Sequence, residues 1–350
     1  MEGWLARFSD EQVRSHPSLA LVAATIGLVT GDGNGLRRWT QAAGVALRRE
    51  GAPEQAAKLE AGLTILQASG GESGMDTMRD DAVRAYELEP EGSAWRPLCR
   101  LFEGVALHLG GDPGEARSAL EEAARRAAAV SPGVQTLCLA QLALVAIDEE
   151  DWDAGEARAA LALAQVERVG ITEYPTEALV FAVSSLVRAR RGRIEDATND
   201  LRQSRALLAA LGDFFPWYDA ETRIVLARAA LRLSDVALAR TLLTEAARAL
   251  RHVPEVPVLD RWLKETRTQA APGAANAGAQ QISLTTAELR VLQFLPSHLS
   301  IREIAERLYV SPNTVKTHAR ALYRKLDASS RAEAVVRADE TGLLDITETV

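Results

Sequence analysis

The chain contains 350 residues, of which 47% are hydrophobic and 25% charged, and its formal net charge is −8. These values are ordinary for a globular protein of two or more domains that folds without cross-links. No apolar run reaches the roughly 18 residues needed to cross a bilayer, and the first residues lack the basic and apolar regions of a secretory signal. We therefore expect a cytoplasmic protein that does not contact a membrane.

The chain has only two cysteines, Cys99 and Cys138, and each lies within an apolar helical pattern. Neither has a second type of metal ligand beside it, so we predict no disulfide framework and no metal site. Buried thiols in a reducing compartment are the expected state. Because the sequence also lacks a nucleophile elbow and paired catalytic carboxylates, it predicts no enzyme, no catalytic residue and no cofactor.

Charge is unevenly distributed along the chain. Residues 281–350 contain nine Lys or Arg and nine Asp or Glu, so the whole −8 lies before them. Within residues 309–326 there are four basic residues and no acidic one. Since an acidic body repels nucleic acid, any DNA contact must be made by a small, locally positive surface.

Residues from about 10 to 269 read as amphipathic helical segments separated by short Gly, Asp or Pro breaks, without strand alternation. Similar pentapeptides recur in the second helix of successive pairs: LRRWT at 36, ARSAL at 116, ARAAL at 157, ATNDL at 197 and ARTLL at 239. A period near 40 that is made of helix pairs indicates an α-solenoid, in which each hairpin buries its apolar face against its neighbours. The sequence therefore predicts an all-α helical-repeat domain over residues 1–265.

Small residues mark where the two helices of a pair could cross closely. Twelve positions before most copies of the pentapeptide stands Ala24, Gly104, Ser185 or Ala227. Val145 occupies the corresponding position of one pair and breaks this pattern.

The stretch GDFFPWYD, at 212–219, gathers four aromatic residues at one junction between helices. Two interpretations are open. Aromatic side chains at such a junction commonly fill the gap between helices. Alternatively, Trp217 and Tyr218 form the rim of a pocket on the concave solenoid surface, which would take a small-molecule or protein effector.

Residues 266–283, TRTQAAPGAANAGAQQIS, lose the helical periodicity and are rich in Ala, Gly and Gln. This composition is typical of a flexible linker. A differently patterned module is predicted over residues 284–350. Three of its helix starts, TTAE at 285, SIRE at 300 and SRAE at 330, match the capping box, in which a hydroxyl and a Glu satisfy free amide groups reciprocally.

A fourth helix start, SPNT at 311–314, has Ser311 as the N-cap and Pro312 at the first helical position, but Thr314 where the others carry Glu. No carboxylate opposes an approaching phosphate here, so the amide dipoles of the helix N-terminus are free for an anion. This difference singles out the helix that follows.

Helical spacing sorts the residues of this fourth helix onto two faces. Val315, Ala319, Leu322 and Leu326 form a core stripe, while the opposite face carries Asn313, Lys316, Thr317, Arg320 and Arg324. The preceding segment offers Ile304, Ala305 and Leu308 as its apolar face, and the short turn between the two predicts a helix-turn-helix. Such a helix can enter a major groove about 12 Å wide. A solvated cationic face without function is the alternative.

Residues 284–344 closely resemble the LuxR-type helix-turn-helix domain of bacterial transcription regulators. The likeness runs through LT, REIAERLYVS, NTVKTH, KL, SR, AV and GLL. It implies a four-helix DNA-binding domain in which Lys316, Thr317 and Arg320 face the bases.

The same resemblance implies two further sets of contacts with double-stranded DNA. Near the phosphates it places Arg302, Thr314, Arg324 and Lys325. On the last helix it makes Val335 and Val336 candidates for pairing two such domains as a homodimer on DNA. RNA polymerase is a further candidate partner for a protein of this kind.

A helical-repeat domain ahead of a LuxR-type domain resembles the arrangement in large MalT-like regulators, whose repeats are similar to tetratricopeptide (TPR) repeats. Those regulators also carry an ATP-binding module with a Gly-rich loop that ends in Gly-Lys-Ser/Thr. The four lysines here, at 58, 264, 316 and 325, never follow a glycine. Two explanations stay open: the sequence is a fragment of a larger regulator, or it is a shortened relative that is controlled without nucleotide.

These patterns together predict a sequence-specific DNA-binding transcriptional regulator: a TPR-like solenoid that senses an effector or partner, a flexible tether and a LuxR-type reader in the nucleoid. The rival prediction is a helical-repeat scaffold that binds proteins and has no specific affinity for DNA.

Overall fold

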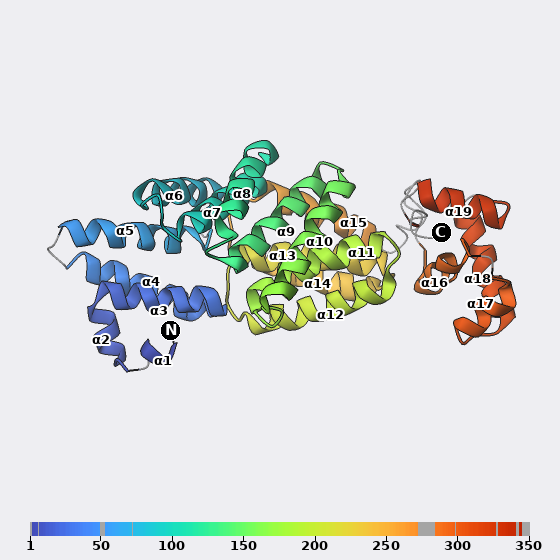
Figure 1. Cartoon of the computed structure of the whole chain (residues 1–350), viewed down its shortest axis with the longest axis horizontal. Coiled ribbons are helices and arrows are strands. Elements are labelled where there is room, and N and C mark those ends of the chain that lie inside the picture. The colour runs from blue at the N-terminus through green and yellow to red at the C-terminus, as the bar shows by residue number, and fades with distance from the viewer. Residues whose placement is uncertain are drawn as a thin grey trace.

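The computed structural model describes residues 2–5, 7–49, 53–71, 73–271, 284–297, 299–326, 328–340 and 343–344. Within these ranges the chain is all-α and contains no β-strand, as predicted. A long array of helices is followed by a smaller group at one end of the molecule (Figure 1). None of the helices in the described ranges combines the length and apolar character needed to cross a membrane.

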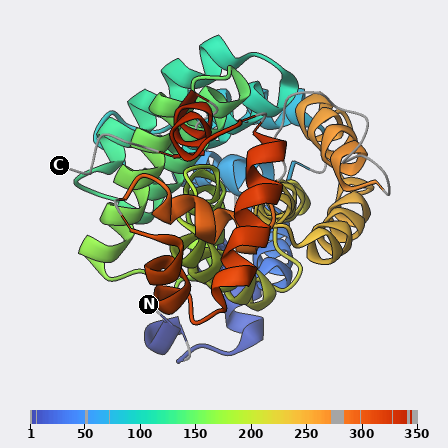
Figure 2. The same ribbon diagram turned by 90° about the vertical axis from the view of Figure 1, so that its right-hand side faces the viewer.

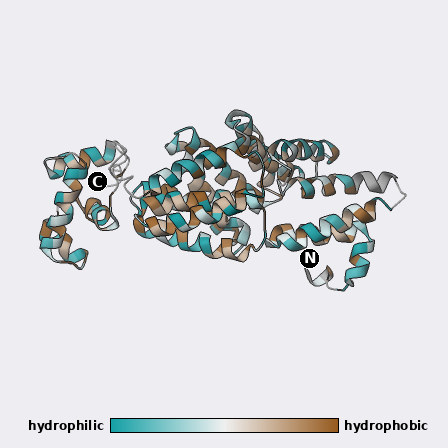
Figure 3. Cartoon of the chain, turned by 180° about the vertical axis from the view of Figure 1, so that it is seen from behind, coloured by the Kyte–Doolittle hydropathy of each residue, from teal (hydrophilic) through white to brown (hydrophobic). Residues whose placement is uncertain are grey.

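The long array is a solenoid of helix pairs, which confirms the predicted fold class. Each pair packs against the next along the chain, and most helices carry both hydrophobic and hydrophilic residues (Figure 3). The array begins with α1 (Glu2–Leu5) and α2 (Asp10–Ser15), ends with α15 (Pro257–Ala270), and contains the following elements between them: α3 (Pro17–Thr30), α4 (Gly33–Leu47), α5 (Pro53–Ala68), α6 (Met75–Leu88), α7 (Arg96–Gly110), α8 (Pro113–Ala127), α9 (Pro132–Asp148), α10 (Trp152–Val169), the 3₁₀ helix η1 (Pro175–Glu177), α11 (Ala178–Arg190), α12 (Ile194–Ala210), α13 (Pro216–Arg232) and α14 (Val236–Leu250).

Four helix pairs of the solenoid share the same type of turn between their two helices. A residue with positive φ ends the first helix, and an aspartate follows at once as the N-cap of the second helix, where its carboxylate accepts a hydrogen bond from the third amide. This turn occurs at Gly31–Asp32, Gly111–Asp112, Glu150–Asp151 and Ser234–Asp235.

Small residues lie at the crossings, as the spacing predicted. A Cβ added to Gly104 would lie 2.5 Å from the Leu120 side chain and 3.3 Å from the carbonyl oxygen of Ala116. Ser185 donates its hydroxyl to the carbonyl of Ala197, 2.8 Å away. In the pair with Val145 the close approach is made by the second helix instead, since a Cβ on Gly155 would lie 2.7 Å from Ile147.

The two cysteines lie inside the solenoid core, as expected. Both Cys99 and Cys138 are fully buried and unpaired. Burial raises the pKa of each thiol, that of Cys99 to about 12. Both thiols therefore stay protonated at neutral pH and contribute as small apolar side chains.

Beyond the solenoid lies a compact C-terminal module of four helices: α16 (Thr286–Phe294), α17 (Ile301–Arg307), α18 (Pro312–Lys325) and α19 (Arg331–Glu340). The capping boxes predicted at Thr285 and Ser300 are both complete. At the start of α19 the amide of Glu333 bonds to Ser330, but the Glu333 carboxylate accepts its bonds from Ser329 instead. Of the predicted linker, residues 266–270 belong to α15, and residues 272–283 lie outside the described residues.

The module contacts the solenoid through two of the solenoid's inter-helix turns. The hydroxyl of Ser234 donates to the carbonyl of Leu284 (2.7 Å), and that of Thr286 donates to the carbonyl of Leu233 (2.9 Å). From the start of α12, Ile194 is buried in the module's own hydrophobic cluster. This contact orients α16 toward the solenoid and leaves α17 and α18 farther out (Figure 1).

Candidate DNA-binding surface

The α17–α18 pair forms a tight helix-turn-helix. Ile304 and Ala305 of α17 are buried, and the small Ala305 allows the two helices to approach. Ser311 caps α18 by accepting the amide proton of Thr314 (3.1 Å), with Pro312 at the first helical position. The capping and the turn length both agree with the sequence prediction.

The turn between these helices is a Schellman motif that closes the C-terminus of α17. The amide of Tyr309 donates to Glu306 and that of Val310 donates to Ala305, at 3.3 and 3.0 Å. The motif requires a left-handed residue, which is usually glycine. Here that residue is Tyr309, with φ +55°.

The two faces of α18 are sorted as the helical spacing predicted. Val315, Ala319, Leu322 and Leu326 are each at most 5% exposed and anchor the helix in the module's core. The remaining positions turn a wide polar face outward, because a helix of this length cannot bury both sides in a four-helix module.

The base-facing candidates Lys316, Thr317 and Arg320 all lie exposed on the outward face of α18, and so does Arg324. Thr317 bonds to the carbonyl of Asn313 within the helix (2.9 Å). No acidic side chain in the described part of the chain pairs with Lys316, Arg320 or Arg324. The face therefore carries three uncompensated positive charges and can bind an anionic partner without first breaking an ion pair.

The phosphate-facing candidates have more varied surroundings. Arg302 is exposed on α17, while Thr314 is half-buried beside the N-cap, where its hydroxyl and that of Ser311 are 2.8 Å apart. Lys325 is already engaged: its ammonium donates to the carboxylate of Glu288 at 2.6 Å. Burial raises the pKa of Glu288, but the bonds from Lys325 and from Thr285 outweigh this and lower it. Lys325 thus links the C-terminus of α18 to the capping box of α16.

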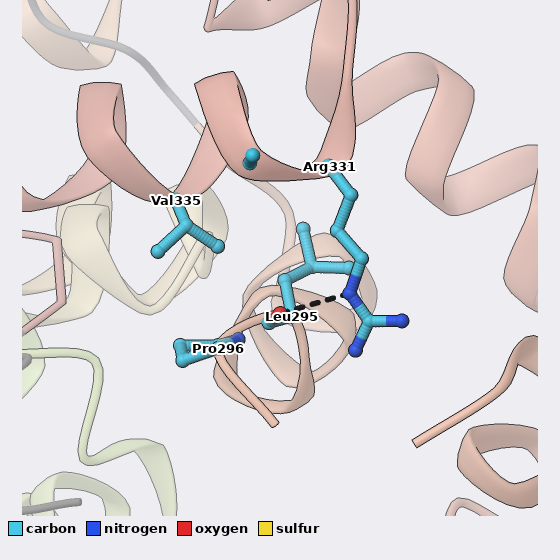
Figure 4. Close-up of a pocket in the computed structure, with 5 residues that line it drawn as sticks. Leu295, Pro296, Arg331 and Val335 are labelled. Atoms are coloured by element: carbon cyan, nitrogen blue, oxygen red, sulfur yellow. Dashed lines mark hydrogen bonds between the residues drawn. The ribbon is translucent and has the colours of Figure 1, made fainter. Parts of the chain in front are cut away.

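Sequence analysis missed the residue that holds the module together. Arg331, at the start of α19, donates to the carbonyls of Phe294, Leu295, Ser297 and Leu299 at 2.6–3.0 Å, and so satisfies the C-terminal end of α16 and the loop before α17. Figure 4 shows its guanidinium bonded to the carbonyl of Leu295, at a surface hollow that both residues line. The SRAE pattern predicted the helix start, but no local pattern reveals a partner more than 30 positions away.

The candidate dimerisation residues lie on α19 beside this hollow. Val335 lines it together with Leu295, Pro296, Arg331 and Ala332, around a volume of about 390 Å³ (Figure 4). Val336 is 53% exposed. Both valines therefore reach the module surface, and pairing of two domains through them stays a prediction.

The solenoid does not cover the cationic face of α18. Seen from the module's end, α17 and α18 lie in front of the solenoid (Figure 2). The hydrogen bonds that join the two parts involve Leu284, Thr286 and Gln293, all at or within α16. The outward face of α18 is accordingly accessible while the module is docked.

The two candidate effector residues lie in the solenoid interior. Trp217 and Tyr218 are each 3% exposed. The indole of Trp217 donates to Ser69 (2.9 Å), and the Tyr218 hydroxyl donates to Thr176 (2.6 Å) while accepting the amide of Leu179 (2.9 Å). Both side chains thus join helices that are far apart in sequence, and the effector pocket there stays a prediction.

Comparison with known proteins supports the C-terminal module directly. Residues 282–338 match the model of the family "Bacterial regulatory proteins, luxR family". The C-terminal module is a LuxR-type helix-turn-helix domain. The match includes both helices of the helix-turn-helix, α17 and α18. The LuxR-type domain makes up the last part of the chain, as the resemblance implied.

Named proteins are similar to this chain over the LuxR-type domain. "Probable transcriptional regulatory protein NarL" of Mycobacterium tuberculosis is 44% identical over 81 residues, which cover 23% of this chain and 34% of that protein. "HTH-type transcriptional regulator MalT" of Vibrio parahaemolyticus is 45% identical over 56 residues, covering 16% of this chain and 6% of that protein. The chain thus spans about a third or less of the length of these relatives.

A solved structure is also similar to part of this chain. "Crystal Structure of Rap Protein Complexed with Competence and Sporulation Factor" aligns with 77% of this chain and 78% of its own, at 12% identity and a TM-score of 0.47.

Proposed function

We propose that the chain is a sequence-specific DNA-binding transcriptional regulator whose helix α18 reads the major groove. The observation that carries this proposal is the outward face of α18, where three unpaired basic side chains are held in fixed positions by a buried stripe on the same helix. A helix of this size fits the groove, and its side chains offer donors of the kind that read guanine edges.

Within this proposal, Lys316, Thr317 and Arg320 contact bases. They are exposed and lie in the first three turns of α18, toward the N-terminal part of a recognition helix, which contacts the base edges. Arg320 has the planar fork that suits a bidentate contact with guanine.

Arg302, Thr314, Arg324 and Lys325 contact phosphates in the same proposal. The hydroxyl of Thr314 and the positive end of the α18 dipole suit one phosphate. The Lys325 ammonium has three donors, so it can keep its bond to Glu288 and still donate to a second acceptor. Such contacts fix the register on the duplex but read no sequence.

We also propose that α19 pairs two copies on DNA through Val335 and Val336, and that the solenoid responds to a small molecule or protein. The exposure of Val336 supports the first idea, since an apolar side chain on an open strip gains from being covered. The second idea rests on the repeat architecture, whose stacked helices form the extended surfaces that bind partners in such proteins.

Selection of bound sites from random DNA by the full chain tests the main proposal. We expect a defined site, with affinity that falls steeply with salt because phosphate contacts release counterions. Arg320→Ala should cost about 1–3 kcal/mol on the selected site and relax the base preference at one position, whereas Arg324→Ala should weaken all sequences alike and reduce the salt slope.

Arg290→Ala is the matched control for both changes. Arg290 is exposed on α16, outside the helix-turn-helix, and its alanine variant should bind every sequence as the wild type does. Recovery of no sequence by the wild-type chain at low salt would refute the regulator proposal and favour the protein-binding scaffold.

A further inference from the structure

The Schellman turn explains the left-handed φ of Tyr309, but the folded state does not explain why a large aromatic residue occupies that position. It is 96% exposed, so its ring contributes almost nothing to the core. It also has φ +55°, in the left-handed region that disfavours side chains with a Cβ. A glycine would complete the same Schellman turn without strain. The sequence therefore keeps a large aromatic residue at a place where its ring adds almost no packing and its Cβ strains the turn.

Residues whose backbone conformation is unfavourable for their type, and which gain no packing in exchange, are expected at functional sites. The position of Tyr309 indicates which site. It lies in the turn between α17 and α18, two residues before the N-cap Ser311. In helix-turn-helix proteins the first helix crosses the DNA backbone and the second enters the groove, so the turn between them passes along the edge of the groove.

Charge around the turn favours an anionic partner. On α17 the exposed Arg302 and Arg307 are balanced by the exposed Glu303 and Glu306, so the net positive charge comes from α18, where Lys316 is exposed. The positive end of the α18 dipole adds partial positive charge next to this turn. A protein surface could also accept an exposed tyrosine, but this setting favours the sugar-phosphate backbone.

We propose that Tyr309 is a DNA-backbone contact, with its ring against a deoxyribose and its hydroxyl donating to a phosphate oxygen at the edge of the groove that α18 enters. This inference rests on the proposed function and adds a contact to it. The contact strengthens binding to all sequences by a similar factor, because the backbone carries no base identity.

Tyr309→Gly separates binding from folding, because it removes the ring and the strain together. Hydrogen exchange of the amides in α17 and α18 of the full chain should show protection equal to or above that of the wild type. The affinity for the selected DNA site, measured by fluorescence anisotropy, should nevertheless fall about tenfold, the factor that corresponds to the loss of one charge-assisted hydrogen bond. Tyr309→Phe should reduce the affinity by a smaller factor, because it removes the hydroxyl but keeps the ring and the strained φ.

A second pair of variants reports the same placement by charge. Tyr309→Lys should tighten binding and steepen the salt dependence by about one counterion, and Tyr309→Glu should do the opposite. The matched controls are Leu161→Lys and Leu161→Glu, which introduce the same charges at a residue that is 56% exposed on α10 of the solenoid. Neither control should change the affinity for DNA.

Equal DNA affinity of the wild type and the Gly, Lys and Glu variants at 309 would overturn the inference. Unchanged DNA affinity with a loss only of transcription by RNA polymerase would also overturn it, and would assign Tyr309 to a protein partner. Both results require that the wild type binds its site. A wild-type chain that selects no site would instead refute the proposed function.

Discussion

Two buried glutamates of the solenoid and one of the LuxR-type module have opposite charge states at pH 7. In the solenoid, Glu177 and Glu221 are at most 1% exposed, and burial raises the pKa of each to about 8, so both are held neutral at pH 7. In the module, Glu288 is 4% exposed, but its ion pair with Lys325 and its capping bonds lower its pKa and keep it charged.

This difference follows from how each part is built. The solenoid stacks most of its repeats into one large cluster, so a carboxyl group in the interior of this cluster lies far from water. The module has four short helices and little interior, so its stability depends more on caps and on links between helix ends. Near the surface of a small core a carboxyl group can stay charged and form an ion pair. Deep in a large core desolvation disfavours the charged form, so the carboxyl group is neutral.

The largest difference in stability between the two parts is expected when Arg331, which joins the helix ends of the module, is removed. Arg331→Ala should destabilise the module by about 4 kcal/mol, because four carbonyl groups lose a charged donor and no solenoid contact replaces it. Hydrogen exchange of α16 and α19 in the full chain measures the effect, while protection in α7–α14 should stay unchanged.

Two further variants sharpen that result. Arg331→Lys should recover only part of the loss, since an ammonium cannot reproduce the planar fork of five donors. The exposed Arg290→Ala should change the protection of α16 little. Full protection of α16 and α19 in Arg331→Ala would show that the core alone holds the module.

How much of these two parts can be predicted from sequence differs for the same physical reason. The solenoid's architecture follows from nearest-neighbour packing, so the 40-residue period and residues such as Gly104 and Ser185 predicted both pairs and crossings. The faces and caps of α18 were likewise predictable, because helical spacing and capping are local. Arg331 and the Lys325–Glu288 pair were not, since each bond joins residues more than 30 positions apart.

Buried carboxyl groups were also beyond sequence analysis, and they predict an unusual pH dependence for the solenoid. Between their ordinary pKa of 4.5 and about 8, Glu177 and Glu221 bind protons in the folded chain that the unfolded chain has released. Stability is therefore greatest at low pH in this window and falls as the pH rises through 8.

His108 acts in the opposite direction but in a separate range. Burial lowers its pKa to about 4 from an ordinary 6.5, so its contribution to stability rises between those values and is constant above 6.5. From pH 6.5 to 8 the two glutamates should therefore lower the solenoid's stability by about 3 kcal/mol.

Urea unfolding of the full chain at pH 6.5, 7.2 and 8.0 measures this decline. The double variant Glu177→Gln, Glu221→Gln should remove it, because the amides bind no proton and can still bond to Thr136 and Gln141. Glu195→Gln, at an exposed position of α12, should leave the decline in place. A wild-type stability that is constant from pH 6.5 to 8 would mean that water reaches both carboxyl groups.

The smallest effect tests whether helix crossings, rather than helix propensity, set the solenoid's stability. Gly104 and Gly110 lie on the same helix, α7. Alanine favours a helix over glycine by about 0.5–1 kcal/mol, so propensity alone predicts that both Gly→Ala changes stabilise.

At Gly110 nothing lies within 4 Å of an added Cβ, and Gly110→Ala should stabilise by that amount. At Gly104 the new methyl group would overlap Leu120, and the overpacking should exceed the propensity gain, for a net loss of about 1–2 kcal/mol. Opposite signs in urea unfolding would establish the crossing as the constraint, whereas equal stabilisation would mean that α7 and α8 can separate without cost.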